Sequence, residues 1–139
     1  MIHMNFHLKP ALLLLAICLP QAAFPLPPLD EETELLLVES VESAVELDLY
    51  NARCRRDDSG RRADALNKEL ASRFRTTVLD VEDDLFPDGS YRASQKRMQE
   101  NFQQRLKEAG GCREAKAKGM YDELRSRYGA AMEKFEKLP

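Results

Sequence analysis

The sequence contains almost no histidine and no tryptophan. Its two histidines, His3 and His7, both lie near the start of the 139-residue chain. Haem proteins, di-iron bundles, zinc hydrolases and Ser-His-Asp enzymes all depend on histidine as a ligand or a base. The chain also has no CxxCH motif and no glycine-rich phosphate loop. These absences argue against each of those sites, and we expect no cofactor and no metal ion.

Cysteine is scarce too, with only Cys18, Cys54 and Cys112 in the chain. No two of them form the CxxC pair of thiol redox enzymes, and two thiols without histidine make a poor zinc-ligand set. In an oxidising compartment we expect Cys54 and Cys112 to form a disulfide. Closing so long a loop stabilises the fold by roughly 4 kcal/mol through the entropy of the unfolded chain. The alternative is that both are free, buried thiols.

No apolar run is long enough to cross a bilayer, which takes about 20 residues. The longest run, residues 11–19, follows a weakly basic segment and precedes Pro20 and the small residues Ala22 and Ala23. This order of basic, apolar and small residues is typical of a secretory signal peptide. We therefore predict that residues 1–23 form a signal peptide and that the protein is secreted or periplasmic, without a membrane span.

Cys18 suggests a different kind of export signal, because a cysteine at the end of such a run can be lipidated. An acylated cysteine usually follows a small residue, whereas Ile17 is branched and bulky. We therefore expect cleavage after Ala23 rather than a lipoprotein. The next residues, 24–29, are rich in proline and predict an extended leader.

The charges of the whole chain nearly cancel. It has 21 Lys and Arg against 24 Asp and Glu, for a formal net charge of -3. Proteins that bind nucleic acid usually carry a strongly basic face, so we expect no nucleic-acid partner. Residues 30–139 have the length of one domain, and we expect a single helical-bundle domain there.

The pattern of apolar residues beyond the leader is helical throughout. Internal proline is confined to Pro87, and apolar residues recur every three or four positions rather than alternating. The spacing predicts helices over about 30–53, 61–86, 90–109 and 112–137. Because the connections are short, neighbouring helices should be antiparallel. We predict an all-α fold, an up-down-up-down four-helix bundle whose disulfide links the end of the first helix to the start of the fourth.

Cys54 does not fit the first helix easily. It lies opposite the main apolar stripe of that helix, on the side of Leu36, Leu47 and Tyr50. Either the helix ends before Cys54, or this second face is covered as well.

The predicted topology gathers arginines at the disulfide end. Five of them fall within residues 53–62, and guanidinium groups bind phosphate and carboxylate through paired hydrogen bonds. The simpler interpretation is a solvated, charged surface. The sharper one is a site for an anion or an acidic partner, formed by Arg53, Arg55, Arg56, Arg61, Arg62 and Arg113.

The acidic segment 80–88 is unusual. In the predicted helix 61–86, Asp80 and the carboxylates after it occupy the last turns, where they oppose the helix dipole. A calcium ion would explain them, but their spacing does not match a calcium loop. The other explanation is a set of salt bridges to Arg92, Lys96 and Arg97.

These features predict a non-catalytic binding or adaptor protein rather than an enzyme. Its partner would be an unidentified protein or an anionic component of the cell envelope, contacted by the arginine-rich end. One alternative is a periplasmic chaperone or enzyme inhibitor that offers the apolar face of Leu36, Leu47 and Tyr50; the same face could join two copies as a homodimer. A less favoured alternative is an enzyme with paired carboxylates.

Overall fold

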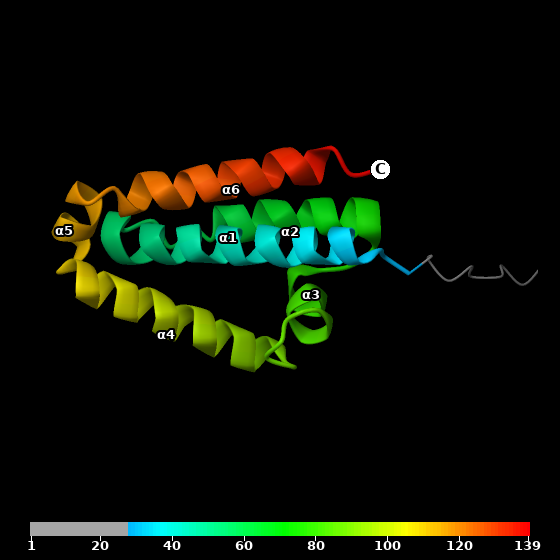
Figure 1. Cartoon of the computed structure of the whole chain (residues 1–139), viewed down its shortest axis with the longest axis horizontal. Helices are drawn as coiled ribbons and strands as arrows, with labels where there is room; N and C mark the ends of the chain where they lie inside the picture. The colour runs from blue at the N-terminus through cyan, green and yellow to red at the C-terminus, as the bar shows by residue number, and fades with distance from the viewer. Residues whose placement is uncertain (1–27) are drawn as a thin grey trace, which may run out of the picture.

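A computed structural model describes residues 28–139 as six helices, without a strand in that range (Figure 1). The helices are α1 (Glu31–Arg55), α2 (Arg61–Phe74), α3 (Val78–Asp84), α4 (Tyr91–Ala109), α5 (Cys112–Ala117) and α6 (Met120–Glu136). The all-α prediction is confirmed. The predicted signal peptide, Cys18 and residues 24–27 of the leader lie outside the described residues.

The helices are arranged around α1. The four long helices alternate in direction, and α4 diverges from α1 towards the end where α3 lies (Figure 1). A regular bundle of four helices is therefore too simple a description. Within residues 28–139 no helix is both long and apolar enough to span a membrane.

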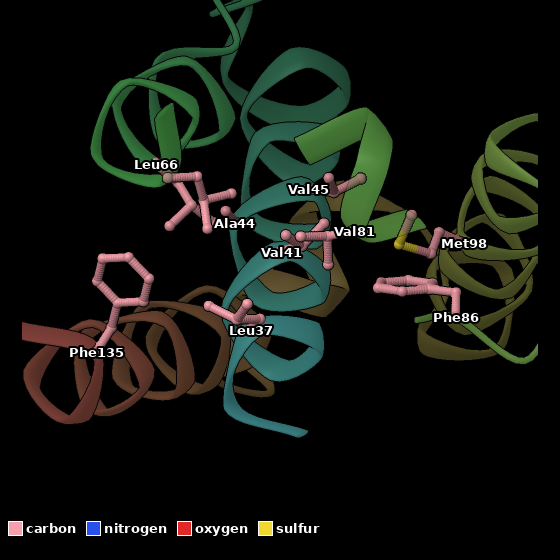
Figure 2. Packing of buried hydrophobic residues seen from close by; sticks show 10 residues of the cluster. Leu37, Val41, Ala44, Val45, Leu66, Val81, Phe86, Met98 and Phe135 are labelled. Atoms are coloured by element: carbon pink, nitrogen blue, oxygen red, sulfur yellow. The ribbon is translucent and has the colours of Figure 1, made fainter. Parts of the chain in front are cut away.

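The larger of the two hydrophobic clusters is built around one face of α1. The apolar residues of this face lie between side chains of α2 and α6 on one side and of α3 and α4 on the other (Figure 2). The buried cluster comprises Leu37, Val41, Ala44, Val45, Leu66, Leu70, Val81, Phe86, Met98 and Phe135.

The opposite face of α1 is covered as well. Leu47 and Tyr50 are each only 2% exposed, and they belong to a second cluster with Phe102, Leu106, Ala115, Met120 and Leu124. Helix α1 continues past Cys54 to Arg55. Of the two explanations for Cys54, the one that holds is that the second face of the helix is covered as well. Leu47 and Tyr50 are thus packed inside the protein and are not available to a client protein or to a second copy, whereas Leu36 is half-buried and lines a hollow between the start of α1 and the end of α6.

The predicted helix 61–86 is wrong, because the chain breaks it into α2 and α3. Arg75 adopts a left-handed conformation (φ 53°) that ends α2. Thr77 then starts α3 with a capping box: its hydroxyl accepts the N–H of Asp80, and the Asp80 carboxylate accepts the N–H of Thr77. Asp80 therefore lies in the first turn of a helix, where the dipole favours a carboxylate, and not in the last.

The predicted helix 112–137 is also interrupted. Gly119 has a φ of 84° and separates α5 from α6, a conformation that glycine adopts at little cost. The interruption turns α5 across the end of the molecule (Figure 1). As a result, α1, α5 and α6 meet at one end, which we call the disulfide end.

The start of α2 is held by a residue of α1. Gly60 precedes α2 and has no side chain to cap it. The carboxylate of Asp48 instead accepts the N–H groups of Arg62 at 3.1 Å and Ala63 at 2.9 Å. This long-range cap satisfies two of the donors that every helix start leaves free and fixes α2 against α1.

Candidate functional site

The disulfide joins the last turn of α1 to the first residue of α5. Cys54 and Cys112 are bonded, with their Cα atoms 5.3 Å apart. This confirms the predicted pairing, although the second cysteine begins the short helix α5 and not a long fourth helix. The bond brings Arg55, which follows Cys54, close to Arg113, which follows Cys112.

A cleft of about 530 Å³ lies beside this bond, and we call it the disulfide cleft. Its walls come from α1, α5 and α6. The lining consists of Tyr50, Cys54, Arg55, Cys112, Arg113, Lys116, Tyr121 and Arg125. It combines four cations with two tyrosines and the disulfide, and it contains no carboxylate.

The two tyrosines of the cleft are stacked. The ring centroids of Tyr50 and Tyr121 are 5.4 Å apart, and the rings are inclined by 26°. The guanidinium carbon of Arg55 lies 4.4 Å from the centroid of Tyr121, and that of Arg125 lies 5.7 Å from it. Such contacts hold a guanidinium in place without occupying its N–H groups, so both arginines keep donors for another molecule.

The part of the chain that the structure describes does not neutralise the four cations of the cleft. Within residues 28–139, no acidic side chain forms a salt bridge with Arg55, Arg113, Lys116 or Arg125. Four positive charges around a partly apolar hollow produce a local positive potential that attracts anions. The arrangement is therefore suited to bind an anionic group.

The structure separates the six arginines that the sequence analysis grouped together. Arg55 and Arg113 line the cleft. Arg61 lies 3.9 Å from Asp57, and Arg62 lies within 3.6 Å of both Asp48 and Asp57. These two arginines are therefore engaged within the protein.

The remaining two predicted arginines lie outside the cleft. Arg56 is exposed and ends α1 in a left-handed conformation. Arg53 lines a neighbouring hollow of about 680 Å³ between α1 and α4, together with Lys107 and mostly apolar or amide side chains. That hollow is larger, but it has two cations instead of four.

Besides the two cysteines, four residues of the cleft were not part of the predicted anion site: Tyr50, Lys116, Tyr121 and Arg125. Tyr121 and Arg125 are four residues apart and so share one face of α6. That spacing was visible in the sequence. The spacing alone did not place this face at the disulfide end. That placement depends on the helix break at Gly119, which makes α6 start beside α5.

Some arginines outside the cleft are paired with carboxylates, and the clearest case is an ion-pair network on α1. Arg127 of α6 donates to Glu46 at 2.7 Å and to Glu42 at 2.9 Å. Arg97 of α4 donates to Glu42 at 3.1 Å. Burial raises the pKa of Glu46, and the charge of Arg127 opposes that effect. These carboxylates hold α4 and α6 against α1, which the sequence did not reveal.

Glu82 of the acidic segment is fully buried. Its carboxylate accepts hydrogen bonds from the Ser94 hydroxyl at 3.1 Å and the Gln95 amide at 2.8 Å. Burial raises the pKa of this carboxyl, while the two hydrogen bonds lower it to a smaller extent. Its neighbours on α4 therefore account for this carboxylate without a bound ion.

The salt bridges expected for the acidic segment are found in part. Arg97 donates to Asp88 at 2.9 Å. Lys96 pairs with Glu100 instead, and Arg92 forms no salt bridge within the described residues. No group of three or more acidic, histidine or cysteine side chains that could hold a metal ion is found among residues 28–139.

Several carboxylates line a third hollow, of about 1000 Å³, between the start of α1 and the end of α6. Asp30 caps α1 there, and the N–H of Thr33 holds its pKa below the ordinary value. Glu39 lies 3.9 Å from Lys134. Asp30 and Glu39 therefore each have a partner within the protein.

Comparison with known protein families, with curated proteins and with solved structures gives no match.

Proposed function

We propose that this protein is an exported, non-catalytic binding protein that holds the anionic group of a partner in the disulfide cleft. The partner is a protein or an anionic component of the cell envelope. The observation that carries the proposal is the convergence of four unpaired cations on one cleft that has no carboxylate.

The contrast with the other arginines supports this proposal. Arg62, Arg97 and Arg127 all have carboxylate partners, so the fold neutralises these three arginines where they join helices. Leaving the cleft cations without partners raises their mutual repulsion, because like charges in one hollow destabilise each other. A negatively charged partner would remove that cost, which gives the cleft a preference for anions.

The chemistry of the lining supports binding rather than catalysis. The cleft contains no histidine and no carboxylate, and its two cysteines are joined to each other. The usual general bases and the thiolate nucleophile are therefore missing from it. The disulfide is also what an oxidising, extracytoplasmic compartment favours.

The proposal is tested by capturing envelope components on the immobilised, oxidised protein. A cleft variant, Arg55→Gln/Arg113→Gln/Arg125→Gln, is compared with a control, Arg53→Gln/Arg56→Gln/Lys107→Gln. Both variants remove the same charge from the same end of the molecule, and the residues of the control lie outside the cleft. Their melting temperatures are measured first, so that a folding defect is recognised.

We expect the cleft variant to lose components that the control retains, and we expect added salt to release those components from the unmodified protein. Equal retention by both variants would contradict the proposal. Equal loss would also contradict it, because general attraction to a basic surface would then explain capture.

A further inference from the structure

We infer that the group held in the disulfide cleft is a doubly charged phosphate monoester attached to an apolar organic group. This inference rests on the proposed function and names the class of ligand. It follows from the charge, the donor geometry and the apolar part of the cleft.

The charge of the cleft exceeds what a single carboxylate can neutralise. Arg55, Arg113, Lys116 and Arg125 bring four positive charges, and the lining offers no negative charge of its own. A phosphate monoester carries about -1.5 to -2 charges near neutral pH and three acceptor oxygens. Among common biological anions it therefore compensates the cleft better than a monoanion does.

The donors have the right geometry for phosphate. Three of the four cations are arginines, whose planar forks bind phosphate oxygens through paired hydrogen bonds. Arg55 and Arg125 are held against the ring of Tyr121. Because the ring restricts these two exposed side chains, binding loses less side-chain entropy than it would with free side chains.

The rest of the lining calls for an organic group. The cleft of about 530 Å³ falls within the range of small-molecule pockets, about 300–1000 Å³, and exceeds the size of an inorganic phosphate ion. Tyr50, Tyr121 and the disulfide supply the apolar part of the lining. A bare ion would leave this surface in contact with water, whereas an alkyl or aryl group next to the phosphate would cover it.

The ionisation of the ligand provides a direct test. The groups that line the cleft are guanidinium, ammonium, phenol and disulfide groups, from Arg55, Arg113 and Arg125, Lys116, Tyr50 and Tyr121, and Cys54 with Cys112. None is a histidine, a carboxylate or a free thiol, the types that ordinarily titrate below about pH 9. The second ionisation of a phosphate monoester occurs near pH 6, so a change in affinity there reports on the ligand.

The experiment is calorimetric titration of the oxidised protein with phenyl phosphate, with benzenesulfonate and with inorganic phosphate. Benzenesulfonate has a similar ring and keeps a single charge at both pH values used. At about pH 7.5 we expect phenyl phosphate to bind at least about tenfold more tightly than either of the other two. At about pH 5 its advantage over benzenesulfonate should shrink to about threefold or less.

Two single variants locate the binding. Arg113→Gln should weaken phenyl phosphate binding by about tenfold or more, whereas Arg53→Gln, in the neighbouring hollow, should change it by less than about twofold. If phenyl phosphate and benzenesulfonate bind equally, and Arg113→Gln weakens both, the cleft binds anions but the inferred class is wrong. If phenyl phosphate does not bind, the inferred class is also wrong, and envelope capture judges the proposed function separately.

Vesicles distinguish a lipid head group from a soluble ester. Sedimentation is measured with phosphatidylcholine vesicles that contain phosphatidic acid, a monoester, or phosphatidylglycerol, a diester. A preference for phosphatidic acid that is lost in Arg113→Gln supports the class and points to a lipid. Binding of phenyl phosphate without vesicle binding supports it and points to a soluble ester. Equal binding to both lipids in the protein and in Arg113→Gln would overturn the inference.

Discussion

The guanidinium of Arg55 lies over the ring of Tyr121, with 4.4 Å between its central carbon and the ring centroid. The contact joins the last turn of α1 to the first turn of α6. Tyr121 is also tied to α1 by stacking on Tyr50. The arginine is thus fixed next to the disulfide while its N–H donors stay available, which is the basis of the proposed anion site.

Replacing Tyr121 tests this contact. Tyr121→Leu removes a cation–π interaction, worth about 0.5–2 kcal/mol, and leaves Arg55 free to move. We expect the affinity for phenyl phosphate, measured by calorimetry, to fall by about threefold to tenfold. Tyr121→Phe keeps the aromatic face and should stay within about twofold of the unmodified protein. Equal affinities for the leucine variant and the unmodified protein would show that the ring does not position Arg55.

Removal of the disulfide should affect both stability and binding. Cys54→Ser/Cys112→Ser loses a cross-link between residues 58 positions apart, which corresponds to about 4 kcal/mol of unfolding free energy. It also frees the end of α1 from α5, so Arg55 and Arg113 are held together less firmly. Urea unfolding measures the first effect and calorimetry the second. A loss of less than about 1 kcal/mol would mean that packing alone holds this end together.

The long-range cap of α2 predicts a sizeable effect of Asp48. Asp48→Ala leaves the N–H groups of Arg62 and Ala63 without their acceptor and removes a partner of the Arg62 side chain. We expect a loss of about 1–2 kcal/mol in chemical unfolding. Asp64→Ala is the control, because Asp64 forms only an exposed pair with Lys68 and should change stability by less than about 0.5 kcal/mol. Similar losses in the two variants would refute the cap.

Glu82 predicts a pH dependence of stability with a definite sign. Burial raises the pKa of this carboxyl in the folded protein, so the folded state binds its proton more tightly than the unfolded state does. The stability that the protonated Glu82 carboxyl contributes is fully present below the pKa of the unfolded state, about 4.3. This stability is lost as the pH rises through the higher pKa of the folded state. Glu82→Gln cannot ionise. Its amide oxygen can still accept the hydrogen bond from Gln95, and its NH2 group can donate to the Ser94 oxygen while the Ser94 hydroxyl donates to the Tyr91 carbonyl.

The stability of Glu82→Gln relative to the unmodified protein should therefore rise with pH, by about 1.4 kcal/mol for each unit by which the pKa is raised. Unfolding at several pH values from about pH 4 upwards measures it. Glu133→Gln is the control: a hydrogen bond from Lys137 lowers the pKa of this exposed carboxyl, so any effect has the opposite sign. A Glu82→Gln protein that becomes less stable with rising pH would contradict this interpretation.

The sequence predicted the helices best where local signals agree. Asp30 and Ser90 are the first residues of the first and third predicted helices, and both accept a backbone N–H at a helix start. The apolar repeat through Leu70, Phe74 and Val78 hid the break at Arg75, because the repeat continues in register and no glycine or proline marks the turn. The Thr77-x-x-Asp80 pattern was the signal that could have shown it.

The site could be predicted only in part, for a physical reason. Composition and topology placed the arginines at one end, but which of them stay unpaired depends on contacts between distant residues. Asp48 engages Arg62 from another helix, and Tyr121 meets Arg55 only because Gly119 turns the chain. Such pairings are set by tertiary packing, which helical periodicity does not encode.

The central claim is that the cations of the disulfide cleft receive an anion. Titration of the oxidised protein with phenyl phosphate, followed through the NMR signals of the arginine side-chain N–H groups, tests it most directly. Saturable shifts at Arg55, Arg113 and Arg125, with Arg61, Arg62 and Arg97 unchanged, are the predicted result. Shifts of similar size at all arginines, or no saturable shift at the three cleft arginines, would contradict the claim.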